Sequence, residues 1–135
     1  MLTEKDYCDY ETCVALKEMG YKGMSRYYYT HRDHKLHYDT YNKFYTVRTA
    51  DAMGYVLAIH LYEAQKFLRE EKGIFVYIDV PWKTDGGLGW SHFCCNKPMA
   101  EEDKEVCFAS GGFYDSYEEA LSEGIKQSVK ILKEE

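Results

Sequence analysis

The chain has 135 residues, of which 45% are hydrophobic and 30% charged, and its formal net charge is −6. This length favours a single domain spanning residues 1–135, and the composition excludes an intrinsically disordered chain. No apolar run approaches the roughly 20 residues that cross a bilayer, and the acidic start lacks the apolar core of a signal peptide. We therefore expect a cytoplasmic protein that makes no contact with a membrane.

The first predicted element is a helix at about residues 10–19. Asp9 is a suitable N-cap, and Gly20 can adopt the left-handed conformation that closes such helices. Two strands joined by a short turn follow at residues 25–30 and 36–41, because tyrosines and other β-formers flank a polar turn there. These two segments predict an N-terminal β-hairpin.

Residues 50–72 allow two interpretations. Apolar residues recur at helical spacing along the whole segment, which permits one long helix. Gly54 weakens the early part of that helix, and residues 55–59 are equally suited to a short apolar strand. We favour a helix that begins near His60, but residues 50–59 stay open between helix and strand.

The remaining sequence predicts a meander and a last helix. Apolar and aromatic runs separated by turn signals predict three strands, at residues 74–80, 90–96 and 105–109. Ser116 and Glu119 form a capping box ahead of a helix at about residues 117–133. The predicted fold class is α+β: an antiparallel sheet, made of the hairpin and the three-stranded meander, with about three helices packed mainly on one face.

Three segments together resemble a known family: YETCVALKEMGY, HLYEAQKFLREEKGIFVYI and FYDSYEEALSEGIKQSVKIL. The resemblance is to small proteins of about this length from gut Bacteroidetes-type bacteria, their mobile elements and their phages. In that family the middle segment opens with a Pro-Thr pair, where this chain has Ile59-His60. The resemblance implies a helix start near His60; the family has no established activity, so it implies no site residues.

The segment 25–46 differs from the rest of the chain. Residues 22–48 hold six Lys/Arg against two Asp, a local charge of +4, and residues 25–46 contain six tyrosines. Cationic side chains interleaved with aromatic rings are typical of surfaces that bind single-stranded nucleic acids. The candidate binding residues are Arg26, Tyr27, Tyr29, Arg32, Lys35, Tyr38 and Tyr41.

The cysteines and histidines predict no metal site. His31, His34 and His37 are spaced H-x2-H-x2-H, but residues three apart on a strand point to opposite faces, so convergence on a metal ion is an outside chance. The five cysteines are an odd number without a recognised ligand spacing, and we interpret them as buried free thiols. The glycine-rich stretches do not match a phosphate-binding loop, so no cofactor is expected.

Two functions of different classes follow from these observations. The first is a non-enzymatic accessory or regulatory module that binds a protein partner, or itself, through a sheet edge or the tyrosine-rich surface. The alternative is a weak single-stranded nucleic-acid binder through residues 25–46, which the overall acidity of the chain disfavours. No nucleophile with a base and an orienting group can be assembled from the sequence, so we do not expect an enzyme.

Overall fold

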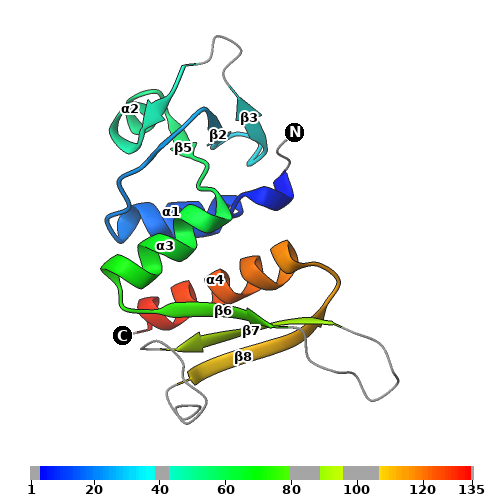
Figure 1. Ribbon diagram of the computed structural model, residues 1–135. Helices are drawn as coiled ribbons and strands as arrows, with labels where there is room; N and C mark the ends of the chain where they lie inside the picture. The colour runs from blue at the N-terminus through cyan, green and yellow to red at the C-terminus, as the bar shows by residue number, and fades with distance from the viewer. Residues whose placement is uncertain (1–3, 39–42, 80–88, 96–106, 135) are drawn as a thin grey trace. The chain divides into compact units, whose positions relative to one another are not determined.

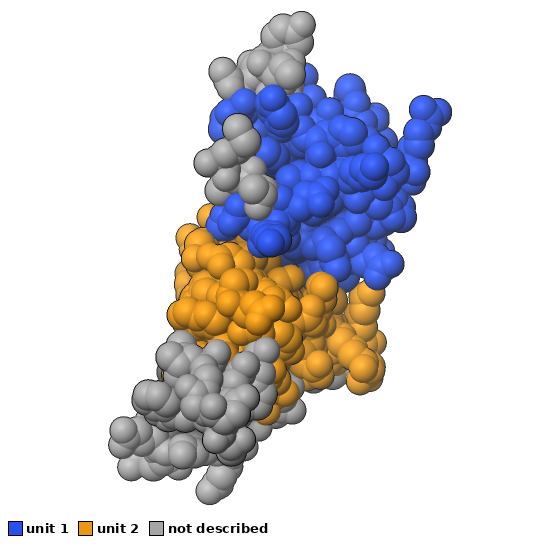
Figure 2. All heavy atoms as spheres, turned by 90° about the vertical axis from the view of Figure 1, so that its right-hand side faces the viewer, with its two compact units in different colours: residues 1–60 blue, residues 61–135 orange. Residues whose placement is uncertain are grey.

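The protein has an α+β fold with antiparallel sheets, as the sequence predicts (Figure 1). The structure is a computed structural model that describes residues 4–38, 43–79, 89–95 and 107–134. The chain divides into two compact units, residues 1–60 (unit 1) and residues 61–135 (unit 2), which Figure 2 colours separately. The single domain expected from the length stays a prediction.

Unit 1 contains two small antiparallel sheets. β1 and β4 form a two-stranded ribbon, and the other sheet has the order β3-β2-β5, with β2 in the centre. The hairpin and the later meander thus lie in separate sheets, where the sequence predicted one. The elements of this unit are η1 (Glu4–Asp6), α1 (Tyr10–Glu18), β1 (Met24–Ser25), β2 (Tyr27–Thr30), β3 (Leu36–Tyr38), β4 (Tyr45–Thr46), α2 (Val47–Ala52) and β5 (Tyr55–Leu57).

The ends of α1 follow the capping signals in the sequence. Asp9 accepts a hydrogen bond of 2.8 Å from the Thr12 amide, which satisfies one of the free donors of the first turn. At the other end Gly20 has φ 102°, and the Tyr21 amide donates back to the Leu16 carbonyl at 3.0 Å. This Schellman arrangement turns the chain sharply into β1.

The ambiguous segment contains both a helix and a strand. Residues 47–52 form α2, Gly54 has φ 79°, and β5 follows. The sequence prediction missed α2, since six residues are too few for a periodic pattern. The signal was present, however: Thr46 and Thr49 form a reciprocal capping box at its start.

The central strand β2 is covered on both faces. Tyr29 is opposite Val56 of β5, and its hydroxyl donates to the Cys8 carbonyl at 2.6 Å, just ahead of α1. Its neighbour Tyr28 points the other way and packs against a cluster of Tyr45, Ala50 and Leu57, which includes α2. The helices of unit 1 therefore pack on opposite faces of this sheet.

Unit 2 has one three-stranded antiparallel sheet, in the order β6-β7-β8 that the predicted meander requires. β8 extends through Ser110-Gly111-Gly112, beyond the end of the strand predicted at residues 105–109. No helix in the described ranges is long and apolar enough to cross a membrane. The elements are α3 (Leu61–Glu71), β6 (Phe75–Asp79), β7 (Trp90–Cys95), β8 (Cys107–Tyr114) and α4 (Tyr117–Lys133).

The long helix α4 lies along one face of this sheet (Figure 1). Ser116 caps its start by accepting from the Glu119 amide at 3.1 Å, as the capping box predicts. Small residues on its buried face let it approach the strands closely. A Cβ added at Gly124 would lie 2.7 Å from Cγ1 of Val76 and 3.1 Å from Cβ of His92.

We predict that Gly124→Ala destabilises the protein, although alanine is the better helix former. The propensity gain is about 1 kcal/mol, whereas overpacking a core typically costs about 1–3 kcal/mol. Because the clash is with Val76, the substitution should cost less in a Val76→Ala background. Urea unfolding of the four variants measures this coupling, with Ser122→Ala as the control for helix propensity; equal costs in both backgrounds would contradict the packing account.

Candidate binding surface

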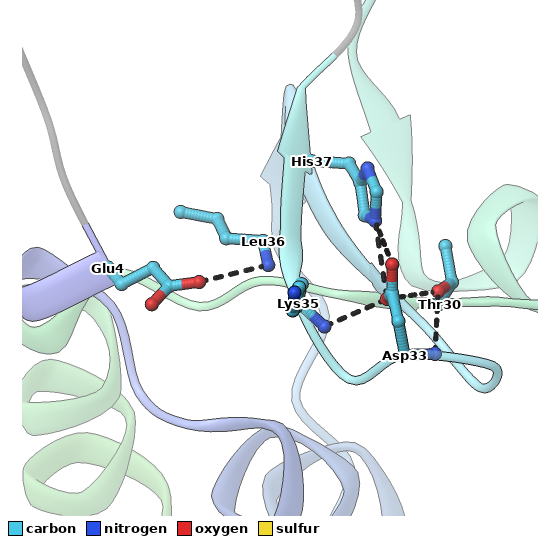
Figure 3. A network of polar contacts seen from close by, with 6 residues as sticks. All are labelled: Glu4, Thr30, Asp33, Lys35, Leu36 and His37. Carbon is cyan, nitrogen blue, oxygen red and sulfur yellow. Dashed lines mark hydrogen bonds and ion pairs between the residues drawn. The ribbon is translucent and has the colours of Figure 1, made fainter.

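A network of polar contacts fixes the turn between β2 and β3 (Figure 3). The Thr30 hydroxyl donates to Asp33 Oδ1 at 2.6 Å, and the Lys35 amide donates to the same oxygen at 2.9 Å. His37 Nε2 lies 3.1 Å from Asp33 Oδ2. Mainly the Thr30 hydroxyl, with help from the Lys35 amide and His37, lowers the pKa of Asp33 to about 2.

The tyrosines of the predicted surface are mostly used for packing. Tyr29 is only 3% exposed, and burial raises the pKa of its hydroxyl. The ring of Tyr27 lies against Tyr7, with centroids 4.9 Å apart, and Tyr28 stacks on Tyr55 at 4.2 Å. Tyr38 is the exception, with 57% of its surface exposed. Tyr41 lies outside the described residues.

Among the described cations of the same segment, Lys43 lies over a tyrosine ring, with its Nζ 5.5 Å from the centroid of Tyr45. Arg32 and Lys35 are exposed at the turn, whereas Arg26 is half-buried ahead of β2. No ring over either turn cation is found in the described part of the chain. The predicted set thus divides into a packed tyrosine core, an exposed polar turn and the exposed ring of Tyr38.

The three histidines of the turn contact two aromatic partners: Tyr10 for His31 and His34, and Tyr28 for His37. His34 stacks on Tyr10 at 3.7 Å, and its φ of 56° places it in the left-handed region. His31 Nδ1 shares a hydrogen bond of 2.7 Å with the hydroxyl of Tyr10, while His37 stacks on Tyr28 at 5.6 Å. Within the described ranges, no three His, Cys, Asp or Glu side chains are grouped so that they could hold a metal ion.

The cysteines behave partly as the sequence predicts. Cys8, Cys13 and Cys94 are buried free thiols. A hydrogen bond with Cys13 and burial raise the pKa of the Cys8 thiol, and burial raises that of Cys94, so both are poor nucleophiles. Cys95 differs from the prediction, because it is disulfide-bonded.

Unit 2 contains a buried histidine that the sequence prediction did not single out. His92 on β7 is 3% exposed and stacks on Tyr114, and its Nδ1 has no hydrogen-bond partner among the described residues. Gly111 leaves room for the ring, since a Cβ there would lie 2.8 Å from its Cε1. A lone histidine in an apolar strand gives no signal in the sequence.

Burial lowers the pKa of His92 below 6.5, and the carboxylate of Glu123 opposes this shift. The imidazole is therefore neutral near pH 7, and the unpaired nitrogen costs stability whichever tautomer is present. The buried imidazole takes up a proton less readily than the same side chain in the unfolded chain. The free energy of unfolding of unit 2 therefore falls in mild acid.

Comparisons with known proteins identify no relative of this chain: no family model, no curated protein and no solved structure matches it. The resemblance to the small proteins of gut bacteria and their phages remains a prediction from the three sequence segments. The function is therefore argued from the geometry alone.

We predict that the turn between β2 and β3 loosens in strong acid. The pKa of Asp33 is depressed, so its contribution is present above pH 3.8 and is lost as pH falls toward about 2. The Lys35 amide resonance should titrate with Asp33 in an NMR pH series. Asp33→Asn keeps an acceptor oxygen and Asp33→Ala does not, so only the alanine variant should lose protection at that amide at neutral pH.

We also predict that stability falls as pH drops below 6.5, because the unfolded state then binds a proton that folded His92 resists. His92→Phe should flatten this dependence between pH 7 and pH 5, measured by urea unfolding. Glu123→Gln should steepen it, since the carboxylate that favours the imidazolium is removed. Unchanged pH dependence in both variants would contradict the assignment to His92.

Proposed function

We propose that the protein is a non-enzymatic module that binds a protein partner through the surface of unit 1. The observation that carries this proposal is the distribution of exposed large hydrophobic side chains. Of the five among the described residues, four belong to unit 1: Met24, Tyr38, Phe44 and Met53. Methionine and aromatic residues are the types enriched in protein interfaces.

Two of these side chains are associated with the β1–β4 ribbon: Met24 lies in β1, and Phe44 directly precedes β4. Met24 is opposite Thr46 in the register, and Phe44 is two residues before Thr46, so the alternation of a strand puts Met24 and Phe44 on one face. They are 62% and 56% exposed, while Tyr45 between them is buried on the other face. The ribbon therefore packs inward with Tyr45 and presents an apolar face outward.

Binding of single-stranded nucleic acid is the less supported alternative. It requires several exposed rings on which bases can stack. Tyr27, Tyr28 and Tyr29 are engaged with other side chains or buried, which leaves Tyr38 among the described tyrosines of the segment. The geometry favours a protein partner because apolar contacts need no cationic groove.

We further propose that the protein acts in the cytoplasm. The free thiols of Cys8, Cys13 and Cys94 support a reducing compartment. The disulfide at Cys95 is the opposing observation, because disulfides persist mainly in oxidising compartments.

The turn histidines support a non-enzymatic role, since they are held by Tyr10, Tyr28 and Asp33.

We predict that replacing Met24 and Phe44 together by serine abolishes partner binding without unfolding the protein, because both side chains are mostly exposed. The control is Tyr62→Ser, which removes a side chain that is 52% exposed in unit 2. Light scattering after gel filtration tests self-association, and affinity capture from native lysate tests another partner. Circular dichroism checks the fold.

The proposal requires a bound partner protein or a self-associated state. The unaltered protein and the Tyr62→Ser variant should retain it, and the variant with serine at both Met24 and Phe44 should lose it. Capture that is insensitive to Met24 and Phe44, or a monomer that retains no partner, would contradict it. Binding of a labelled oligonucleotide at low salt, lost with Arg32→Gln, would favour the alternative instead.

A further inference from the structure

Unit 1 contains a pocket beside the β1–β4 ribbon, with a volume of about 550 Å³. Its lining comes from the connection between α1 and β1, residues 20–24, and from the start of α2, residues 46–48. Lys17 and Asp51 complete it. Small-molecule sites typically have volumes of about 300–1,000 Å³, so the pocket is large enough for a small organic ligand.

The pocket is formed by backbone that the local structure fixes. The Schellman cap at Gly20 sets the direction of residues 20–24, and the pairing of Met24 with Thr46 holds the two parts of the lining together. Gly23 passes directly beneath the ring of Tyr21, where any Cβ would overlap the hydroxyl. A site that exists before the ligand arrives loses little entropy on binding.

The charges of the lining favour an anion. Lys17, Lys22 and Arg48 are cationic, and the carboxylate of Asp51 is already paired with Lys17 Nζ at 2.8 Å. Neither Lys22 nor Arg48 makes an ion pair or hydrogen bond within the described parts of the chain. Two unpaired cations therefore line one pocket in a chain whose formal net charge is −6.

The rest of the lining is mostly apolar. Tyr21 contributes an aromatic ring, Val47 a branched side chain and Met24 a flexible thioether that adapts to different shapes. A purely inorganic anion would leave this surface unused. The lining matches a ligand with one charged end and an apolar body.

We propose that this pocket binds a small amphipathic anion: a carboxylate, sulfonate or phosphate monoester carried on an apolar or aromatic body. Lys22 and Arg48 attract the charged end, and Tyr21, Met24 and Val47 contact the body. This site is independent of the proposed protein-binding function, although Met24 borders both.

The test uses 1-anilinonaphthalene-8-sulfonate as the probe, with N-phenyl-1-naphthylamine as the neutral counterpart that lacks the sulfonate. We expect the anionic probe to bind the unaltered protein with one-to-one stoichiometry and to shift the amide NMR signals of residues 20–24 and 46–48. The neutral probe should bind at least about tenfold more weakly. Added salt should lower the affinity of the anionic probe but not that of the neutral one.

A charge-removing variant adds a second arm. Lys22→Gln with Arg48→Gln should weaken binding of the anionic probe about tenfold, since two exposed cations contribute modest attraction in water. Arg32→Gln with Lys35→Gln removes the same charge from the β2–β3 turn and should leave binding unchanged. NMR shifts confined to other residues, equal affinity for the neutral probe, or no effect of the pocket substitutions would overturn the proposal. Should the pocket variant fail to fold, the salt and neutral-probe results on the unaltered protein decide.

Discussion

Packing on both faces of β2 is the constraint on which the rest of unit 1 depends. A strand at the centre of a sheet alternates its side chains, so Tyr29 faces α1 while Tyr28 faces α2. Tyrosine suits this position, because its ring fills a core and its hydroxyl satisfies a backbone carbonyl such as that of Cys8. A composition that resembles a binding surface is thus largely used in packing. Two of the exposed apolar side chains, Met24 and Phe44, belong instead to the β1–β4 ribbon or lie directly ahead of it.

In unit 2 the packing of helix against sheet depends on small residues of α4. Gly124 and Ser128 let α4 approach the sheet, and the Ser128 hydroxyl donates to the Gly124 carbonyl at 2.9 Å within the helix. The same closeness encloses His92 and leaves its Nδ1 unpaired. An apolar residue there would avoid this cost, so the imidazole is a local conflict between polarity and burial of the kind that concentrates at functional positions.

The sequence predicts those parts of the fold that local chemistry decides. Asp9, Gly20 and Ser116 mark helix ends because capping depends on neighbouring residues alone, and all three act as expected. It did not predict β5 beside β2, nor the burial of Tyr29, because both depend on pairings between distant segments. The pocket was missed for the same reason: Lys22 and Arg48 are 26 positions apart in the sequence and meet only through the ribbon.

The two ends of unit 1 meet in an isolated antiparallel bridge between Tyr7 and His60, and the Cys8 amide donates to the Ile59 carbonyl at 2.8 Å. Segments whose entry and exit points adjoin are the ones that tolerate transplantation into a loop of an unrelated host protein. Residues 7–60 are therefore suited to grafting as an insert, with the host chain entering and leaving through neighbouring backbone positions. Because of this bridge, a truncation that removes residues beyond Asp6 should destabilise unit 1, since it deletes Tyr7 and with it the pairing to His60.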